Sequence, residues 1–289
     1  MTAAEPSSSV HGPALIDGFS LEMTGRDIDE LARVRDVIPP GTRIHVTFLQ
    51  SEDAEVRIAA AQAVIDAGFV AVPHIAARRI PSAQALDSFL GRLRDVGAIE
   101  HLCVIGGDPS HAEGPYASAL DLIRTEALAV HGAREVWIAG YPEGHPDIPT
   151  DVLWKHLAAK TTAIREQEMS VGVATQFAFD ADRVAEWVGE MRDRDHTMPL
   201  RIGAPGPTTV KRLVGFARRF GVGANAMIVK KYGFSLANLV GTAGPERFVT
   251  DLEARLVAEP RAGDPSLHLY TFGGLRQTAE WARDAARPR

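Results

Sequence analysis

Short apolar runs alternate with segments of helical periodicity along most of the chain. The runs are often β-branched, as buried strands are; they lie at Phe19 to Met23, Ile44 to Leu49, Phe69 to Pro73, His101 to Ile105, Val136 to Gly140, Val171 to Phe177, Leu200 to Gly203 and Leu267 to Thr271. The helical patterns lie between them at Asp27 to Val37, Asp53 to Ala67, Ala83 to Val96, Tyr116 to Val130, Thr150 to Glu168, Ala181 to Arg194 and Thr208 to Phe220. Asn225 to Leu256 predicts two more helices broken at Gly241 to Pro245, and Gln277 to Ala286 predicts a closing helix.

This alternation predicts a fold of the α/β class. Strands joined by helices form right-handed βαβ units, and eight such units close into a (β/α)₈ TIM barrel, here with extra helices before the last strand. An open doubly wound sheet is the alternative. That fold favours a G-x-G-x-x-G turn after its first strand, which Glu22 to Arg26 does not supply.

The length and composition favour one catalytic domain. A barrel of about 250 residues uses most of the 289 residues, and no linker is evident. We therefore expect a flexible N-terminal segment over residues 1–15 and a barrel over residues 16–289. Hydrophobic residues make up 45% and charged residues 24%, which is ordinary for a soluble globular protein. The net charge of −6 disfavours nucleic acid as a partner.

The cysteine usage and the apolar segments indicate the compartment. Cys103 is the only cysteine, which excludes a disulfide within the chain and a cluster of several thiolates. No apolar stretch approaches the roughly 18 residues of a membrane span, and residues 1–13 lack the basic and apolar regions of a signal peptide. The sequence therefore predicts a cytoplasmic protein with no membrane partner.

Polar side chains follow several of the predicted strands. The stretch Val136 to Pro146 shows this most clearly, because its apolar run ends in aromatic, acidic and imidazole groups. Functional side chains of a barrel lie at the carboxyl ends of its strands. The candidates are Glu22, Thr47, His74, Asp108, Tyr141, Glu143, His145, Gln176 and Tyr270.

Each candidate also has a purely structural interpretation. Glu22 is either a solvated carboxylate or a general acid whose pKa an apolar pocket raises. Asp108 follows Gly106 and Gly107, which either let a ligand approach the backbone or form an ordinary turn. Gln176 could instead hydrogen-bond neighbouring strands.

Metal and anion sites have weaker signals. His74 and His145 lack partners at zinc-ligand spacing, so we expect no metal. The pairs Arg78-Arg79 and Lys230-Lys231 either bind an acidic ligand or are solvated surface. The segment Gly203 to Pro207 leads into a predicted helix N-terminus, where anions can bind, or is a plain connection.

An ordered set of short motifs resembles the methylenetetrahydrofolate reductase family. The motifs are Ser20 to Glu22, His45 to Thr47, Pro73-His74, Gly107-Asp108, Ala139 to Pro146, Thr175 to Asp180, Pro205-Gly206 and His268 to Thr271. The resemblance extends from Phe19 to about Trp281. It implies a barrel that reduces 5,10-methylenetetrahydrofolate to 5-methyltetrahydrofolate with NADH, or with NADPH as the alternative donor.

The resemblance also implies roles for individual residues. Glu22 matches the general acid that assists opening of the imidazolidine ring, so that a 5-iminium cation forms and accepts hydride. Asp108 and Gln176 match pterin-binding positions, and the Asp108 carboxylate suits stabilisation of the cation. Thr47, Phe177 and Tyr270 are the further expected substrate contacts. The expected cofactor contacts are His74, Tyr116, Tyr141, His145 and Lys160.

The chain departs from the family at several expected flavin contacts. Gly106 stands where the family usually has an arginine, and the residues from Trp154 to His156 do not align cleanly with the usual contacts. These departures resemble a flavin-independent subgroup, in which nicotinamide delivers hydride directly, FAD is absent and the protein is a monomer. One alternative is an FAD-dependent reductase. Another is a non-redox folate-binding or methyl-transferring barrel, although pterin binding alone needs no proton donor at Glu22.

Overall fold

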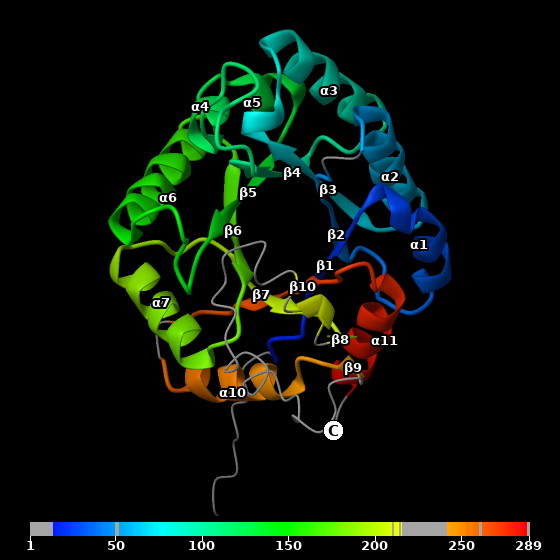
Figure 1. The fold of residues 1–289 in the computed structure, drawn as a ribbon, viewed down its shortest axis with the longest axis vertical. Helices are drawn as coiled ribbons and strands as arrows, with labels where there is room; N and C mark the ends of the chain where they lie inside the picture. The colour runs from blue at the N-terminus through cyan, green and yellow to red at the C-terminus, as the bar shows by residue number, and fades with distance from the viewer. Residues whose placement is uncertain are drawn as a thin grey trace, which may run out of the picture.

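Eight parallel strands close into a barrel, and helices surround it as an outer ring (Figure 1). The computed structural model describes residues 14–49, 52–209, 211–213, 215, 242–259 and 262–287. Around the barrel the strands follow the order β1, β10, β7, β6, β5, β4, β3, β2. Their bounds are β1 Ser20–Met23, β2 Arg43–Val46, β3 Val70–Ala76, β4 His101–Ile105, β5 Glu135–Gly140, β6 Ser170–Phe177, β7 Leu200–Pro205 and β10 Ser266–Tyr270. The predicted TIM barrel is thus confirmed, and the open sheet is excluded.

Helices α2, α3, α4 and α7 begin at capping side chains. Ser82 accepts a hydrogen bond from the backbone N–H of Ala85, and Asp180 accepts one from that of Arg183, as N-caps do. None of the described helices has the length and apolar character needed to cross a membrane. The bounds are α1 Ile28–Val34, α2 Ala54–Asp66, α3 Ala83–Asp95, α4 Ala119–Ile123, α5 Ala127–His131, α6 Thr150–Arg165, α7 Ala181–Asp193, α10 Glu246–Val257 and α11 Leu275–Ala285, with short 3₁₀ helices η1 Gly25–Asp27 and η2 Ala77–Arg79.

Two predicted helices are wrong in part. The single helix expected over Tyr116 to Val130 is split into α4 and α5, because Glu126 between them adopts a left-handed backbone conformation with φ of 62°. The helix expected from Thr208 begins later. Thr208–Thr209 forms strand β8, which pairs antiparallel with β9, Thr242–Ala243. Residues 216–241, which include the Lys230-Lys231 pair, lie outside the described residues.

Side chains pack the interior of the barrel as well as the layer between strands and helices. Val72, Cys103, Trp137 and Ala174 form an apolar cluster inside it. Gly172 makes room for the indole ring, because a Cβ at this position would lie 2.7 Å from ring atoms of Trp137. This packing closes the middle of the barrel and leaves the carboxyl ends of the strands as the place for a site.

A charged network lies beneath Trp137, at the amino ends of the strands. The Glu135 carboxylate accepts hydrogen bonds from His101 Nδ1 at 2.9 Å and Trp137 Nε1 at 3.0 Å, and it pairs with Arg43 at 3.3 Å. Burial alone would raise the pKa of Glu135, but these hydrogen bonds and the Arg43 charge outweigh it and lower the pKa to about 2. The Arg201 guanidinium lies over the Trp137 ring, 5.1 Å from its centroid.

Replacing Glu135 with glutamine is expected to destabilise the fold without touching the opposite end of the barrel. Loss of one partner of a buried ion pair costs about 3–5 kcal/mol, and we expect the lower end of that range because the Glu135 side chain is 16% exposed. At roughly 2–4 °C per kcal/mol, Tm should fall by roughly 6–12 °C at pH 7.

The Glu135→Gln effect should depend on pH. The folded-state pKa of Glu135 is depressed from 4.5 to about 2, so its contribution is present above the unfolded value and is lost as the pH falls through this interval. Thermal unfolding of both proteins should therefore give a Tm gap that is constant above pH 5 and narrows toward pH 2. A gap that does not change with pH would show that the Glu135 charge contributes nothing to stability.

Candidate active site

Glu22 lies on β1, and its side chain points into the mouth of the barrel. Ser20 lies two residues before it, on the same face, because side chains of a strand alternate with period two. His268 of the neighbouring strand β10 contacts both residues: its Nε2 lies 3.3 Å from Glu22 Oε1, and its Nδ1 lies 2.8 Å from Ser20 Oγ. Ser20 and His268 are register partners. The Glu22 side chain is 16% exposed, so it is largely shielded from water yet open to a ligand in the mouth.

A pair of histidines, His45 and His74, adjoins His268. The His45 ring on β2 lies 4.4 Å from the His268 ring, centroid to centroid, and its Nδ1 lies 3.0 Å from His74 Nε2. Burial lowers the pKa of His74 to about 3 and holds that of His45 well below its usual value. Both rings are therefore neutral at pH 7. His74 lies within β3 rather than after it, because this strand continues to Ala76.

Cys103 lies beside these two histidines. The possible ligand atoms of His45, His74 and Cys103 all lie within 4.8 Å of one another, on three different strands, which linear spacing could not reveal. Burial raises the pKa of the Cys103 thiol, so it stays protonated, and its side chain packs in the interior apolar cluster. The histidine–histidine hydrogen bond and this apolar packing account for the three positions. The expected absence of a metal stays a prediction.

The ends of β6 and β10 form an aromatic wall of the mouth. The Tyr270 hydroxyl donates to the Thr175 carbonyl at 2.9 Å, and the Phe177 and Tyr270 rings lie 5.1 Å apart. Phe272 also packs edge-on against Phe177. Burial, and then the nearby Glu22 charge, raise the pKa of Tyr270 well above its usual value, so it remains a neutral phenol.

Gln176 is directed by an irregularity in β6. The register with β7 shifts between Ala174 and Phe177, as at a β-bulge, and bulges re-aim side chains near active sites. Thr175 Oγ1 accepts a hydrogen bond from the Gly203 N–H at 2.8 Å. A Cβ on Gly203 would lie 2.5 Å from the Thr175 carbonyl oxygen, so the close approach requires glycine. Gln176 Oε1 accepts from the Phe177 N–H at 3.2 Å.

Asp108 lies on the exposed loop after β4. Gly107 before it has φ of 91°, a conformation that favours glycine. Arg78 holds this loop by donating to the carbonyls of Pro109 and Ala117. Arg79 pairs with a glutamate of the same loop, at 2.7 Å. The Arg78-Arg79 pair thus has partners within the protein, which favours its structural interpretation.

Tyr141 and His145 lie on the loop between β5 and α6. Burial raises the pKa of Tyr141, so it is a neutral phenol at pH 7. The rings of Tyr141 and His145 meet edge to face, with centroids 5.4 Å apart. Each is thus positioned at the rim of the mouth.

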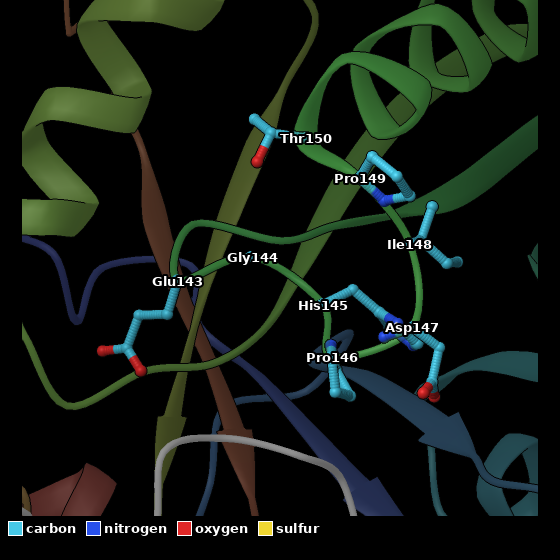
Figure 2. A pocket seen from close by; sticks show the side chains of 8 residues that line it. All are labelled: Glu143, Gly144, His145, Pro146, Asp147, Ile148, Pro149 and Thr150. Carbon is cyan, nitrogen blue, oxygen red and sulfur yellow. Dashed lines mark hydrogen bonds between the residues drawn. The ribbon is translucent and has the colours of Figure 1, made fainter.

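Residues 143–149 of this loop and Thr150, the first residue of α6, line a cavity of about 560 Å³ (Figure 2). Figure 2 shows the Glu143 carboxylate on the opposite side of the loop from the His145 and Asp147 side chains. Glu143 Oε1 accepts hydrogen bonds from the N–H groups of Phe179 and Asp180, at 2.8 and 2.7 Å. Glu143 therefore ties this loop to the start of α7, which is a structural role.

The remaining predicted residues lie in different settings. Thr47 Oγ1 donates to the carbonyl of Met23 at 3.1 Å. Met23 directly follows Glu22 in the chain. Lys160 on α6 is 9% exposed, and burial lowers its pKa to about 8, so it is a cation at pH 7. Among the described residues no ion pair to Lys160 is found. Tyr116 packs in the main core and is 5% exposed.

Sequence reasoning did not single out Ser20, His45 or His268 as site residues. Each had a signal, since Ser20 and His268 lie two residues before Glu22 and Tyr270, and His45 lies two residues before Thr47. Applying the period of two to each candidate would have placed all three on the inward face.

The family model and the curated relatives that match this chain carry the same description. The family model described as "Methylenetetrahydrofolate reductase" matches residues 24–274. Two plant proteins named "Methylenetetrahydrofolate reductase (NADH) 1" are similar to the chain: that of Arabidopsis thaliana is 26% identical and that of Zea mays 25% identical, each over 227 residues. These matches cover 69% of this chain and 35% of each relative, so the chain spans about a third of their length. Among solved structures, dihydropteroate synthase from Thermus thermophilus is 14% identical, with a TM-score of 0.47, covering 94% of this chain and 96% of that one.

Proposed function

Because the chain belongs to the methylenetetrahydrofolate reductase family, we propose that it reduces 5,10-methylenetetrahydrofolate to 5-methyltetrahydrofolate with hydride from NADH. The observation that carries this proposal is the shielded Glu22 carboxyl, hydrogen-bonded to His268 in the mouth of the barrel. A folate-binding barrel without redox chemistry has no use for such a group. The names of the two plant relatives include NADH, which favours NADH over NADPH as the hydride donor.

Glu22 serves as the general acid in this proposal. Its protonated carboxyl donates to a nitrogen of the imidazolidine ring as the carbon–nitrogen bond breaks, and the electron pair of that bond stays on the nitrogen. A 5-iminium cation results, whose carbon accepts the hydride. The low exposure of Glu22 shields the proton transfer from bulk water.

The pterin is held by residues from several strands. The aromatic wall of Phe177 and Tyr270 offers apolar contact, while Gln176 and Thr47 offer polar groups. Asp108 on the facing loop contributes a negative charge that attracts the developing cation. The two carboxyl groups thus have different surroundings, since Glu22 is shielded and Asp108 is exposed.

NADH supplies hydride, and Lys160, His74, Tyr116, Tyr141 and His145 are the proposed contacts to this donor. Lys160 is suited to a phosphate group because it is a shielded cation. We propose that hydride passes directly to folate without FAD. Gly106 carries no cation for a flavin, although a Cβ at Gly106 would meet no atom within 4 Å and a side chain would fit.

The test is NADH oxidation by the purified protein with methylenetetrahydrofolate and no added flavin, with the visible spectrum of the same sample. We expect folate-dependent oxidation by colourless protein, and initial rates that indicate a ternary complex. Stoichiometric flavin bands with ping-pong kinetics would instead establish the FAD-dependent reductase. Absence of oxidation with and without FAD, together with folate binding, would establish the non-redox alternative.

A further inference from the structure

The hydrogen bonds around His268 form a short chain from β1 to β10 and back. Ser20 Oγ lies 2.8 Å from His268 Nδ1, and Glu22 Oε1 lies 3.3 Å from His268 Nε2. His268 is 1% exposed and Ser20 is 0% exposed, so protein groups surround both. Ser20 and Glu22 project from the same strand face, and the imidazole ring lies between them.

We propose that His268 is a positioning residue for Glu22, with Ser20 holding its imidazole in the tautomer that carries the proton on Nε2. This proposal rests on the proposed general-acid function of Glu22. In this arrangement the Ser20 hydroxyl donates to Nδ1, and Nε2–H donates to Glu22 Oε1. The acidic proton of Glu22 then resides on its other oxygen, which is left to face a ligand.

The opposite tautomer would not serve the reaction. If Nδ1 carried the proton, the unprotonated Nε2 would accept the acidic proton of Glu22 and draw it away from the substrate. With Nε2–H as donor, the carboxylate that remains after proton transfer gains a hydrogen bond at once. The serine hydroxyl can donate or accept, but as a donor it selects the productive tautomer.

Most of the described side chains around the pair are neutral at pH 7, and Arg201 is the nearby cation. His45 from β2 packs against the His268 ring and is held neutral by burial. Tyr270 from β10 and Cys103 from β4 are neutral, because burial raises the pKa of each. The other titratable groups around these rings are His74 on β3, and Arg201 on β7, which donates to the Gly18 carbonyl.

The proton balance of the step is simple. The O–H bond of Glu22 breaks and an N–H bond forms on the leaving nitrogen of the substrate. The His268 proton stays on Nε2 throughout. The Nε2–H group donates to the carboxylate that forms, so His268 stabilises Glu22 after it has released its proton.

The first experiment reads the tautomer directly. Two-bond ¹H–¹⁵N correlation spectra of the ¹⁵N-histidine-labelled full chain distinguish a protonated Nε2 from a protonated Nδ1. We expect His268, identified by the loss of its signals in His268→Gln, to carry the proton on Nε2, and Ser20→Ala to give a mixture. A protonated Nδ1 in the wild-type chain would overturn the proposal, and this result does not depend on turnover.

The second experiment reads the consequence for catalysis. Because Glu22 must be protonated to act, kcat falls as the pH rises through its pKa. Removing the His268 donor raises that pKa, so in His268→Gln the alkaline limb should move up by about one pH unit or more, the equivalent of a charge-assisted hydrogen bond. We expect kcat below the limb to fall about tenfold with KM for folate unchanged, and an intermediate shift in Ser20→Ala.

Matched variants separate this role from folding. Thr278→Val removes another fully buried hydroxyl, on α11, which donates to the Gly274 carbonyl at 2.9 Å, and should leave the pH profile unchanged. A loss of kcat in His268→Gln with no displacement of the limb would mean that His268 is only structural. A wild-type chain without turnover would refute the proposed function, while ¹³C titration of Glu22 with and without His268 would still decide the hydrogen-bond proposal.

Discussion

Replacing Glu22 with glutamine is expected to lower kcat by about 10²–10⁴-fold, which is the usual contribution of a general acid. Glutamine has nearly the same size as glutamate and can still accept from His268, but it has no acidic proton to release. Folate should bind almost as well, because the aromatic wall and Gln176 are unchanged. The measurement is steady-state NADH oxidation across folate concentrations, with folate binding determined separately by fluorescence titration.

The control for Glu22→Gln is Glu135→Gln, the same chemical change at the other end of the barrel. Glu135→Gln should lose stability but retain kcat at a temperature where both proteins are folded. Unchanged turnover in Glu22→Gln would remove Glu22 from the mechanism. Loss of folate binding equal to the loss of rate would instead make Glu22 a binding residue.

The architecture was accessible from the sequence because it depends on patterns that are local. Each apolar run of the barrel was placed by its hydrophobicity and its β-branched residues. The capping residues Ser82 and Asp180 likewise act on backbone groups within three residues of themselves. The predicted helix over Tyr116 to Val130 was wrong because its apolar periodicity continues through Glu126, whereas the backbone there is left-handed. Periodicity reports which side chains are buried, and it does not report a break between two helices that bury the same face.

The site was accessible only as a set of separate candidates. Glu22, Tyr270 and Gln176 were predicted individually because each ends an apolar run, but their relation depends on strand neighbours. β1 and β10 lie at opposite ends of the sequence, so the contact between Glu22 and His268, 246 residues apart, follows only from closure of the barrel. The buried histidine pair likewise results from strand register, and no linear spacing encodes it.

Charge pairs along the sequence were ambiguous for a similar reason. From the sequence, Arg78 and Arg79 could equally be an anion site or solvated surface. In the structure Arg78 donates hydrogen bonds to two backbone carbonyls, and Arg79 forms an ion pair with a glutamate. Lys160 was expected as a cofactor contact only from the family resemblance, because the polar residues of helix α6 do not distinguish it. Burial distinguishes it, since a shielded cation needs a ligand or partner more than an exposed one does.

Replacing Asp108 with asparagine is expected to lower kcat/KM for folate by about 10²–10³-fold, the range found when one preorganised electrostatic group at a transition state is removed. Asparagine preserves shape and hydrogen-bonding capacity, so the effect isolates the charge. Asp108 is exposed in the ligand-free chain, where water screens it, and a bound pterin would displace that water and strengthen its attraction for the cation. KM should therefore rise and kcat should fall together.

The matched control for Asp108→Asn is Asp151→Asn, which removes another exposed carboxylate on the same side of the barrel, where α6 begins. Asp151 pairs with Lys155 one turn along the helix, and both side chains are exposed, so this variant should lose little stability and keep its kinetics. If Asp108→Asn lowers Tm while kcat/KM stays within twofold, Asp108 supports the loop and not the reaction. If KM alone rises, its charge holds the ground-state pterin, and stabilisation of the cation must come from elsewhere in the mouth.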